Sequence, residues 1–245
     1  MSSRASASVD LWTLELSASQ LEVAGAASML SRQERSRAAR YRRTEDRRRF
    51  VVAHGLVRIV LGLYLAIAPD ELVFTEGPRG KPTVSDPPRP LSYSLSHSGR
   101  RALLAVSDGA EVGVDVECAS GFRFPDAALL AARSLAAEEL EALARVRPNG
   151  RPRAVLQAWT RKEAALKARG DGLRADLRRF AALPRGASVG FCVYDLPLGR
   201  PYVGALASLL PVGRRRDFGA SWCDWRRLRH CGRFARATRA DWEVG

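Results

Sequence analysis

The stretch Gly113-Val114-Asp115-Val116-Glu117 alternates valine with small or acidic residues, as a half-buried β-strand does. Because successive side chains of a strand point to opposite faces, Asp115 and Glu117 share one face and the valines share the other. Two carboxylates so close together repel each other unless a cation lies between them. Such oxygens suit Mg²⁺, although an exposed strand edge with an acidic pair is an alternative interpretation.

A second stretch places a third acid on a helix. Residues 154–169 have a helical pattern, and Gly170 is a typical helix C-terminus. Trp159, Glu163 and Lys167 are spaced by four, so they share one helical face. An ordinary Glu–Lys pair beside a core tryptophan would have the same spacing. Together with the acidic strand, however, this helix predicts a site in which three acids hold a metal beside basic groups.

Lysine occurs only in two short motifs of this chain. Lys81 lies in Gly80-Lys81-Pro82, and Lys162 and Lys167 lie in the helix, whereas arginine supplies the other positive charges. A compact ammonium retained only there points to phosphate chemistry. Three acids around Mg²⁺ with a ring of Lys, Arg and His, to which the upstream Ser96-His97-Ser98 would belong, would stabilise charge on a pyrophosphate. We therefore predict Mg²⁺-dependent transfer from a pyrophosphate donor, although spacing identifies neither donor nor acceptor.

The bulk composition limits the class of protein. The 245 residues are enough for one large domain or two smaller halves, and the formal charge of +14 favours an anionic partner. The N-terminus has no apolar signal core, and the apolar run 51–68 is interrupted by charge, so we expect a cytoplasmic protein without a membrane span. The four cysteines are expected to be reduced thiols. A zinc site at Cys223, His230 and Cys231 is an alternative that has no evident fourth ligand.

The order of predicted elements indicates an α+β fold. A strand (9–16), an Arg-rich helical stretch (31–64), a loop (77–90) and strands (102–107 and 111–117) are followed by helices (129–146 and 154–169) and strands (189–196 and 202–207). Ser134 is a possible cap for a second part of the stretch 129–146. Strand, long helix, loop and strands thus occur twice. We expect two similar halves, residues 1–110 and 111–210, forming a pseudo-twofold pair, and a basic tail at 211–245.

Four motifs in order resemble one family. They are Gly80-Lys81-Pro82, Ser94-Leu95-Ser96-His97-Ser98, Gly113-Val114-Asp115-Val116-Glu117 and the stretch from Trp159 to Lys167. Together they are similar to the signature of the Sfp-type 4'-phosphopantetheinyl transferases, over residues 9 to 207. The resemblance implies two similar α/β halves with coenzyme A between them. It also implies that a carrier-protein serine attacks the β-phosphate of coenzyme A, releasing adenosine 3',5'-bisphosphate.

The resemblance also implies roles for individual residues. By motif position, Asp115, Glu117 and Glu163 would bind Mg²⁺, and Glu163 would activate the carrier serine directly or through a metal-bound water. Lys167 would contact the pyrophosphate. The remaining coenzyme A contacts would come from basic and polar residues, with Lys81 at the adenosine end: Arg37, Arg49, Lys81, Ser96 and His97. A solvated basic helix face is the alternative for the two arginines, and a structural role is the alternative for His97.

The expected partner is an acyl or peptidyl carrier protein, whose acidic helix would meet basic and apolar surface. A nucleic-acid-binding protein is a competing class because of the charge of +14, but nucleic acid does not require the three acids. A transferase-like scaffold without activity is a third alternative, which the intact acids and lysines disfavour. Two halves in one chain would supply a cleft, so a monomer is expected.

Overall fold

The structure is a computed structural model. The residues that it describes are 6–77, 80–108, 110–170, 176–182, 187–188 and 190–220. Most of the predicted basic tail therefore lies outside the described residues, with its tryptophans Trp222, Trp225 and Trp242 and the zinc candidates Cys223, His230 and Cys231. Within the described ranges, no helix is long and apolar enough to cross a membrane.

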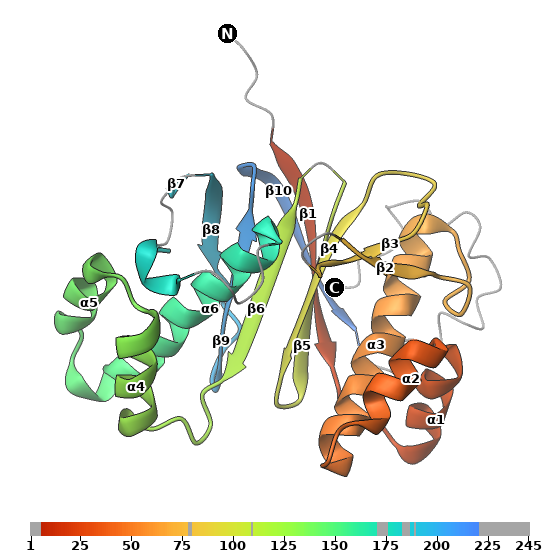
Figure 1. Ribbon diagram of the computed structural model, residues 1–245, viewed down its shortest axis with the longest axis horizontal. Helices are drawn as coiled ribbons and strands as arrows, with labels where there is room; N and C mark the ends of the chain where they lie inside the picture. The colour runs from red at the N-terminus through yellow and green to blue at the C-terminus, as the bar shows by residue number, and fades with distance from the viewer. Residues whose placement is uncertain are drawn as a thin grey trace, which may run out of the picture. The chain divides into compact units, whose positions relative to one another are not determined.

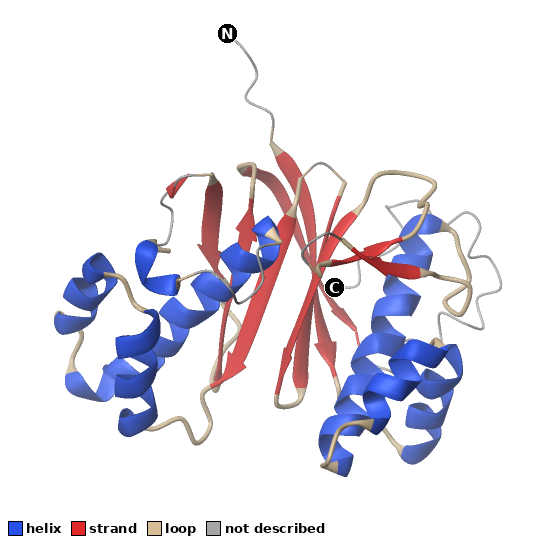
Figure 2. Cartoon of the chain, viewed as in Figure 1, coloured by secondary structure: helices blue, strands red, loops and turns tan. Residues whose placement is uncertain are grey.

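The chain divides into two compact units. The first contains the residues up to Thr13 with Phe74–Val84 and Pro90–Phe218, and the second contains Leu14–Val73 and Ser85–Arg89. This division follows contacts, so it does not test the similarity expected between residues 1–110 and 111–210, which stays a prediction. Helices and sheets both contribute throughout (Figure 2), and the α+β class is confirmed.

One four-stranded sheet of the first unit has the order β10-β1-β5-β4. Its strands are β1 (Ala7–Glu15), β4 (Ser92–Ser98), β5 (Arg101–Ser107) and β10 (Val212–Ala220). β4 and β5 form an antiparallel hairpin in which Ser98 pairs with Arg101. Gly99 turns the chain there with φ of 59°, a conformation that glycine adopts without strain.

A second four-stranded sheet of the same unit has the order β6-β9-β8-β7. Its strands are β6 (Val112–Cys118), β7 (Ala187–Ser188), β8 (Phe191–Asp195) and β9 (Tyr202–Ser208). Helix α6 (Arg151–Arg169) covers one face, as Figure 1 shows, where Ala164 and Ala168 pack on Val193. On the other face, the valines of β6 join Val9 and Leu103 of the first sheet in a common core.

Shorter elements complete the first unit. β2 (Phe74–Glu76) and β3 (Pro82–Val84) form a two-stranded antiparallel sheet. Helices α4 (Phe124–Ser134) and α5 (Ala137–Ala144) pack beside α6. The single-turn 3₁₀ helices are Pro148–Gly150 and Leu177–Arg179.

The second unit contains α1 (Gln20–Met29), α2 (Arg32–Ala39) and α3 (Thr44–Leu65). Ser19 and Ser31 begin α1 and α2 with capping boxes. Arg58 of α3 is fully buried, and it donates to Glu34 of α2 at 2.6 and 3.0 Å and to the carbonyl oxygens of Pro69 and Leu72 at 2.8 and 2.9 Å. One arginine thus holds α2 and the chain after α3 onto α3.

Several predicted element boundaries are wrong. The helical stretch expected at 31–64 is two helices, separated between Ala39 and Thr44. The stretch expected at 129–146 is divided as predicted, but it begins earlier, at Phe124, and the N-cap of its second part is Ala136 and not Ser134. The region expected as loop from residue 77 includes β3, and β10 was not predicted. By contrast, the end of α6 at Gly170, which has φ of 70°, is confirmed.

Candidate active site

The acids of β6 and the charged face of α6 meet in the first unit. Asp115 is only 4% exposed, and the ammonium of Lys167 lies 2.7 Å from its Oδ1 atom. Glu117 and Glu163 are partly buried, and each is close enough to Asp115 to be repelled by it. The structure therefore brings together the three predicted acids and Lys167.

Gly113 explains how α6 can lie so close to the acidic strand. A Cβ atom on this residue would lie 2.0 Å from the carbonyl oxygen of Ala164 and 2.4 Å from the amide nitrogen of Ala168. Both neighbours are helix backbone, which cannot move aside as a flexible side chain can. Glycine at this position therefore allows the backbone of α6 to contact β6, two residues from Asp115.

Burial raises the pKa of all three acids, and repulsion between the carboxylates adds to the effect at Glu117 and Glu163. Burial raises the pKa of Asp115, although Lys167 opposes that effect. Burial and the neighbouring charge of Asp115 raise the pKa of Glu117. Burial, with repulsion from Asp115 and Glu117, raises the pKa of Glu163 to about 7. Three carboxyl groups whose ionised forms are disfavoured together form a cluster that a further cation would stabilise.

Two atoms of this cluster fit a cation. Among the described residues, the Oδ2 atom of Asp115 and the Oε1 atom of Glu163 are buried and accept no hydrogen bond. Buried carboxylate oxygens are normally paired, so such atoms require an explanation. Hard divalent cations such as Mg²⁺ bind carboxylate oxygens, and the donor set is therefore chemically suitable.

The arrangement is not a complete metal site as it stands. No three Asp, Glu, His or Cys side chains in the described part of the chain are grouped so that they could hold a metal ion. The ammonium of Lys167 donates to Asp115 Oδ1 and supplies a positive charge beside the acids. The predicted Mg²⁺ ligands are therefore neighbours, and Asp115 and Glu163 each have a buried oxygen that accepts no hydrogen bond from a described residue. The metal itself remains a proposal.

Ser96 and His97 lie in β4, and they have different surroundings. The Ser96 hydroxyl donates to Asp115 Oδ1 at 2.8 Å and accepts from the amide of Val116 at 3.3 Å. A hydroxyl has one proton, so Ser96 cannot donate to a phosphate oxygen while it donates to Asp115. His97 is exposed. The phosphate contacts predicted for both residues stay predictions.

Lys81 lies in the first unit and is bound to the strand that carries the acids. Its ammonium lies 2.5 Å from Glu111 Oε2 and 2.9 Å from the carbonyl oxygen of Val112. The chain between β2 and β3 is therefore connected to the start of β6. The predicted contact of Lys81 with the adenosine end of coenzyme A is not tested by this geometry.

Arg37 and Arg49 belong to the second unit. The Arg37 guanidinium lies 5.7 Å from the ring centre of Phe50, and Arg49 forms surface ion pairs with Glu45 at 3.2 Å and Asp46 at 3.5 Å. The Nε atom of Arg49 is buried and has no hydrogen-bond partner among the described residues. Arg49 therefore has a donor that no described group uses, and its side chain would have to move before a phosphate oxygen could reach that buried atom.

The expectation that all three lysines serve phosphate chemistry is wrong for Lys162. Its side chain is fully buried, and its ammonium lies 2.7 Å from Glu139 Oε2. It also donates to the carbonyl oxygens of Leu177 at 2.6 Å and Phe180 at 2.5 Å. Lys162 therefore joins α5, α6 and the segment after α6, and no donor remains for a ligand.

Sequence reasoning missed the neighbours of the acids in β4. Ser98 donates to Glu117 Oε2 at 2.8 Å, as Ser96 does to Asp115. The available signal was the spacing of serine at every second position of 92–98, which matches the two-residue spacing of the acids. Nothing in that spacing reveals that the two strands are neighbours.

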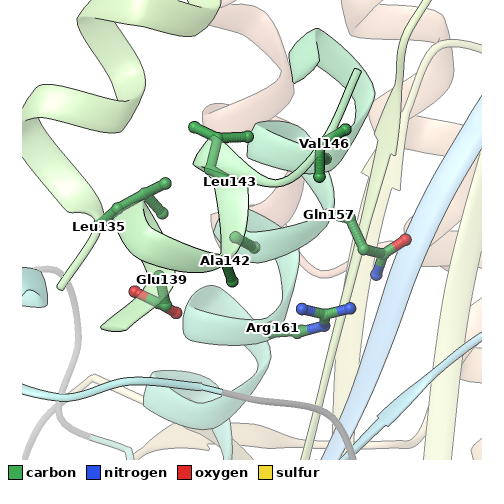
Figure 3. A pocket seen from close by; sticks show the side chains of 9 residues that line it. Leu135, Glu139, Ala142, Leu143, Val146, Gln157 and Arg161 are labelled. Carbon is green, nitrogen blue, oxygen red and sulfur yellow. The ribbon is translucent and has the colours of Figure 1, made fainter. Parts of the chain in front are cut away.

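An open groove of about 200 Å³ lies between α5 and α6, and it is shown in Figure 3. Leu135, Leu143 and Val146 form much of its wall, and Glu139 and Arg161 border it. Glu139 is engaged by Lys162, and Arg161 by Asp195. None of the predicted site residues lines this groove, so the candidate site is identified by its charged groups and not by a cavity.

Comparison with protein families adds independent evidence. Residues 111–203 match the model of the 4'-phosphopantetheinyl transferase superfamily. Residues 15–109 match the model described as the N-terminal region of 4'-phosphopantetheinyl transferase. The two matches adjoin, and the first one includes Asp115, Glu117, Glu163 and Lys167.

Curated relatives agree with these models. The chain is 36% identical over 169 residues to the 4'-phosphopantetheinyl transferase HetI of Nostoc sp., covering 67% of this chain and 70% of the relative. It is 35% identical to AcpT of Salmonella typhi, covering 56% and 69%, and 30% identical to psf-1 of Bacillus pumilus, covering 62% and 63%. The matches thus span about two thirds of the relatives' length. The chain belongs to the 4'-phosphopantetheinyl transferases.

Proposed function

We propose that this chain transfers the 4'-phosphopantetheine group of coenzyme A to a serine of an acyl or peptidyl carrier protein, as an Sfp-type enzyme located in the cytoplasm. The serine oxygen would form a bond to the β-phosphorus, and the bond from that phosphorus to the bridging oxygen would break. Adenosine 3',5'-bisphosphate would leave. Family membership and the cluster of three acids with Lys167 support this assignment.

Glu163 is the proposed acceptor of the serine proton. Without a cation, burial and the neighbouring acids raise the pKa of Glu163 to about 7. A bound cation would lower this pKa and keep Glu163 ionised, as an acceptor of a proton must be. Asp115, Glu117 and Glu163 are the proposed ligands of Mg²⁺. When bound, the ion would neutralise charge on the pyrophosphate.

Lys167 and the residues of the second unit are proposed to bind coenzyme A. Lys167 is 30% exposed, and its ammonium has three donors, of which Asp115 occupies one. It could therefore contact a pyrophosphate oxygen without leaving Asp115. Arg37 and Arg49 are proposed to hold the 3'-phosphate, with Lys81 and His97 as further contacts. The Nε atom of Arg49 has no hydrogen-bond partner in the part of the chain that the structure describes.

The observation that carries the proposal is a pair of buried oxygens, Asp115 Oδ2 and Glu163 Oε1, which accept no hydrogen bond from any described residue. The test is incubation of the protein with coenzyme A, Mg²⁺ and a panel of apo-carriers, followed by mass spectrometry. We expect one phosphopantetheine added to at least one carrier, and loss of this modification in D115N, in E163Q and with chelator. D195N is the matched control, because Asp195 is an aspartate of the same sheet that pairs with Arg161. Full modification by both D115N and E163Q would contradict the proposal.

A further inference from the structure

Serine side chains join the two sheets of the first unit. Ser92, Ser94, Ser96 and Ser98 of β4 accept hydrogen bonds from β6, and we call these four residues the serine row. The donors are the amides of Val112, Val114, Val116 and Cys118, at 3.4, 3.1, 3.3 and 3.0 Å respectively. The partners differ by twenty residues in every pair, so β4 and β6 run in the same direction in a constant register.

The serine row completes the hydrogen bonding of β6. This strand pairs with β9 along one edge, while its other edge faces β4 (Figure 1). Amide groups at an open strand edge need acceptors, which a neighbouring strand normally supplies as carbonyl oxygens. Here the acceptors are hydroxyl oxygens. Unlike a carbonyl group, each hydroxyl also has a proton to donate.

Those protons are given to acids. Ser92 donates to Glu111 at 3.0 Å, Ser96 to Asp115 at 2.8 Å and Ser98 to Glu117 at 2.8 Å. Each of these serines thus accepts a hydrogen bond from the amide of one residue in 111–118 and donates one to the carboxylate of the preceding residue. Ser94 is the exception, because the corresponding residue is Gly113, which has no side chain.

The geometry at Asp115 shows what such donation achieves. Ser96 and Lys167 both donate to Oδ1, and the buried Oδ2 atom accepts no hydrogen bond from any described residue. Two donors on one oxygen fix the rotation of the carboxylate and leave the second oxygen available. Groups that orient metal ligands in this way commonly affect metal affinity as well as activity.

We propose that Ser96 and Ser98 are positioning residues for the divalent cation, which act by fixing the carboxylates of Asp115 and Glu117 from the neighbouring strand. This inference rests on the proposed function, because it assumes that these acids bind the cation. It assigns the serines no contact with the metal. Ser94 also accepts a hydrogen bond from an amide of β6, but no carboxylate lies opposite it, so we expect it to have no such role.

The test measures metal binding directly. Mn²⁺ replaces Mg²⁺ as a probe, and free Mn²⁺ is measured by electron paramagnetic resonance with the full chain in the absence of coenzyme A. We expect S96A and S98A each to weaken Mn²⁺ binding by about 10-fold or more, the range of ~10–100-fold typical for partners of metal ligands. S94A removes the same hydroxyl from the same strand face, and we expect it to bind Mn²⁺ as the wild type does.

Further variants separate the alternatives. S98T retains a hydroxyl at a partly exposed position, so it should bind Mn²⁺ with nearly wild-type affinity. If S96A does not fold, the comparison of S98A with S98T still tests the inference. Unchanged Mn²⁺ binding in S96A and S98A would overturn the inference and leave the proposed function intact, as would equal losses in S94A. If S96A bound coenzyme A more weakly but bound Mn²⁺ as the wild type does, Ser96 would instead be a contact of a coenzyme A phosphate, and its positioning role would be overturned. Failure of the wild type to bind Mn²⁺ would overturn both the inference and the proposed metal.

Discussion

Lys162 shows at the scale of one residue how burial determines what a lysine does. It lies one residue before Glu163, yet its ammonium is enclosed by Glu139, two carbonyl oxygens and the ring of Phe180 at 4.8 Å. Burial lowers its pKa, and Glu139 opposes that effect. Glu139 in turn accepts from the amides of Ala136 and Ala182 at 2.8 and 3.0 Å. The pair therefore joins three segments: α5 with its N-cap, α6 and residues 177–182.

We predict that K162M destabilises the fold strongly. Loss of the ammonium would leave the buried Glu139 carboxylate without a counter-ion, and breaking one partner of a buried pair costs roughly 3–5 kcal/mol. The free energy of unfolding, measured in urea, would show this loss. K162M combined with E139L should be more stable than K162M alone, because the unpaired charge is then removed. Equal stability of K162M and the wild type would contradict the structural role.

At the scale of elements, the contact of α6 with β6 depends on Gly113. We predict that G113A prevents this contact, because its Cβ atom would overlap the backbone of Ala164 and Ala168 at 2.0 and 2.4 Å. Both the midpoint of thermal unfolding and the transfer of phosphopantetheine should fall steeply. G150A is a matched control, since its Cβ atom would meet only a side-chain atom of Val146 at 3.2 Å. A G113A protein with wild-type stability would show that α6 can move away without cost.

A second relation between elements predicts how stability depends on pH. Burial opposes ionisation of Glu34, but hydrogen bonds from His54 and Arg58 outweigh it and lower the pKa to about 2, from 4.5 for an isolated side chain. Ionised Glu34 therefore contributes stability at pH values above 4.5, and this contribution is lost as the pH falls toward 2. It amounts to roughly 3 kcal/mol if the whole shift is expressed.

E34Q should therefore be less stable than the wild type at pH 6, and the difference should shrink between pH 4.5 and pH 2. Urea unfolding at several pH values measures it. E45Q is the control, because the Glu45 side chain is 63% exposed and pairs with Arg49 at the surface. A stability difference between E34Q and the wild type that stays constant over this pH range would disagree with the lowered pKa.

At the scale of the whole molecule, charge should influence the encounter with a carrier protein. The chain has a net charge of +14, and complementary charge accelerates association mainly at low ionic strength. We predict that kcat/KM for an acidic carrier falls as NaCl is raised, with KM rising and kcat nearly constant. Binding of coenzyme A is measured separately at each salt concentration. A carrier-modification rate that is independent of salt would exclude steering by charge.

Much of the site could be predicted because its information is local. The period of two in 113–117 placed Asp115 and Glu117 on one strand face, and the period of four placed Glu163 in line with Lys167. The motifs then indicated the family. Such regularities depend on neighbouring residues in the sequence, and they do not require knowledge of how distant segments pack.

The errors concern contacts between distant segments. The separation of α2 from α3 accompanies the contact of Glu34 with Arg58, which is twenty-four residues away. β10 pairs with β1, and Arg216 binds Asp10 across 206 positions of the chain. The serine row depends on the register of two strands whose own hydrogen bonds belong to different sheets. The first two relations have no period that the sequence could display, and the period of two in the serines does not reveal that β4 and β6 are neighbours.

The serine row also affects how this protein can change over evolutionary time. A carbonyl acceptor is part of the main chain, so no codon change can delete it, whereas each hydroxyl of β4 is encoded individually. A single nucleotide substitution can therefore remove one connection between the sheets and leave the others in place. The hydrogen bonds between the two sheets can thus be changed one at a time by mutation, next to the acids on which the proposed chemistry depends.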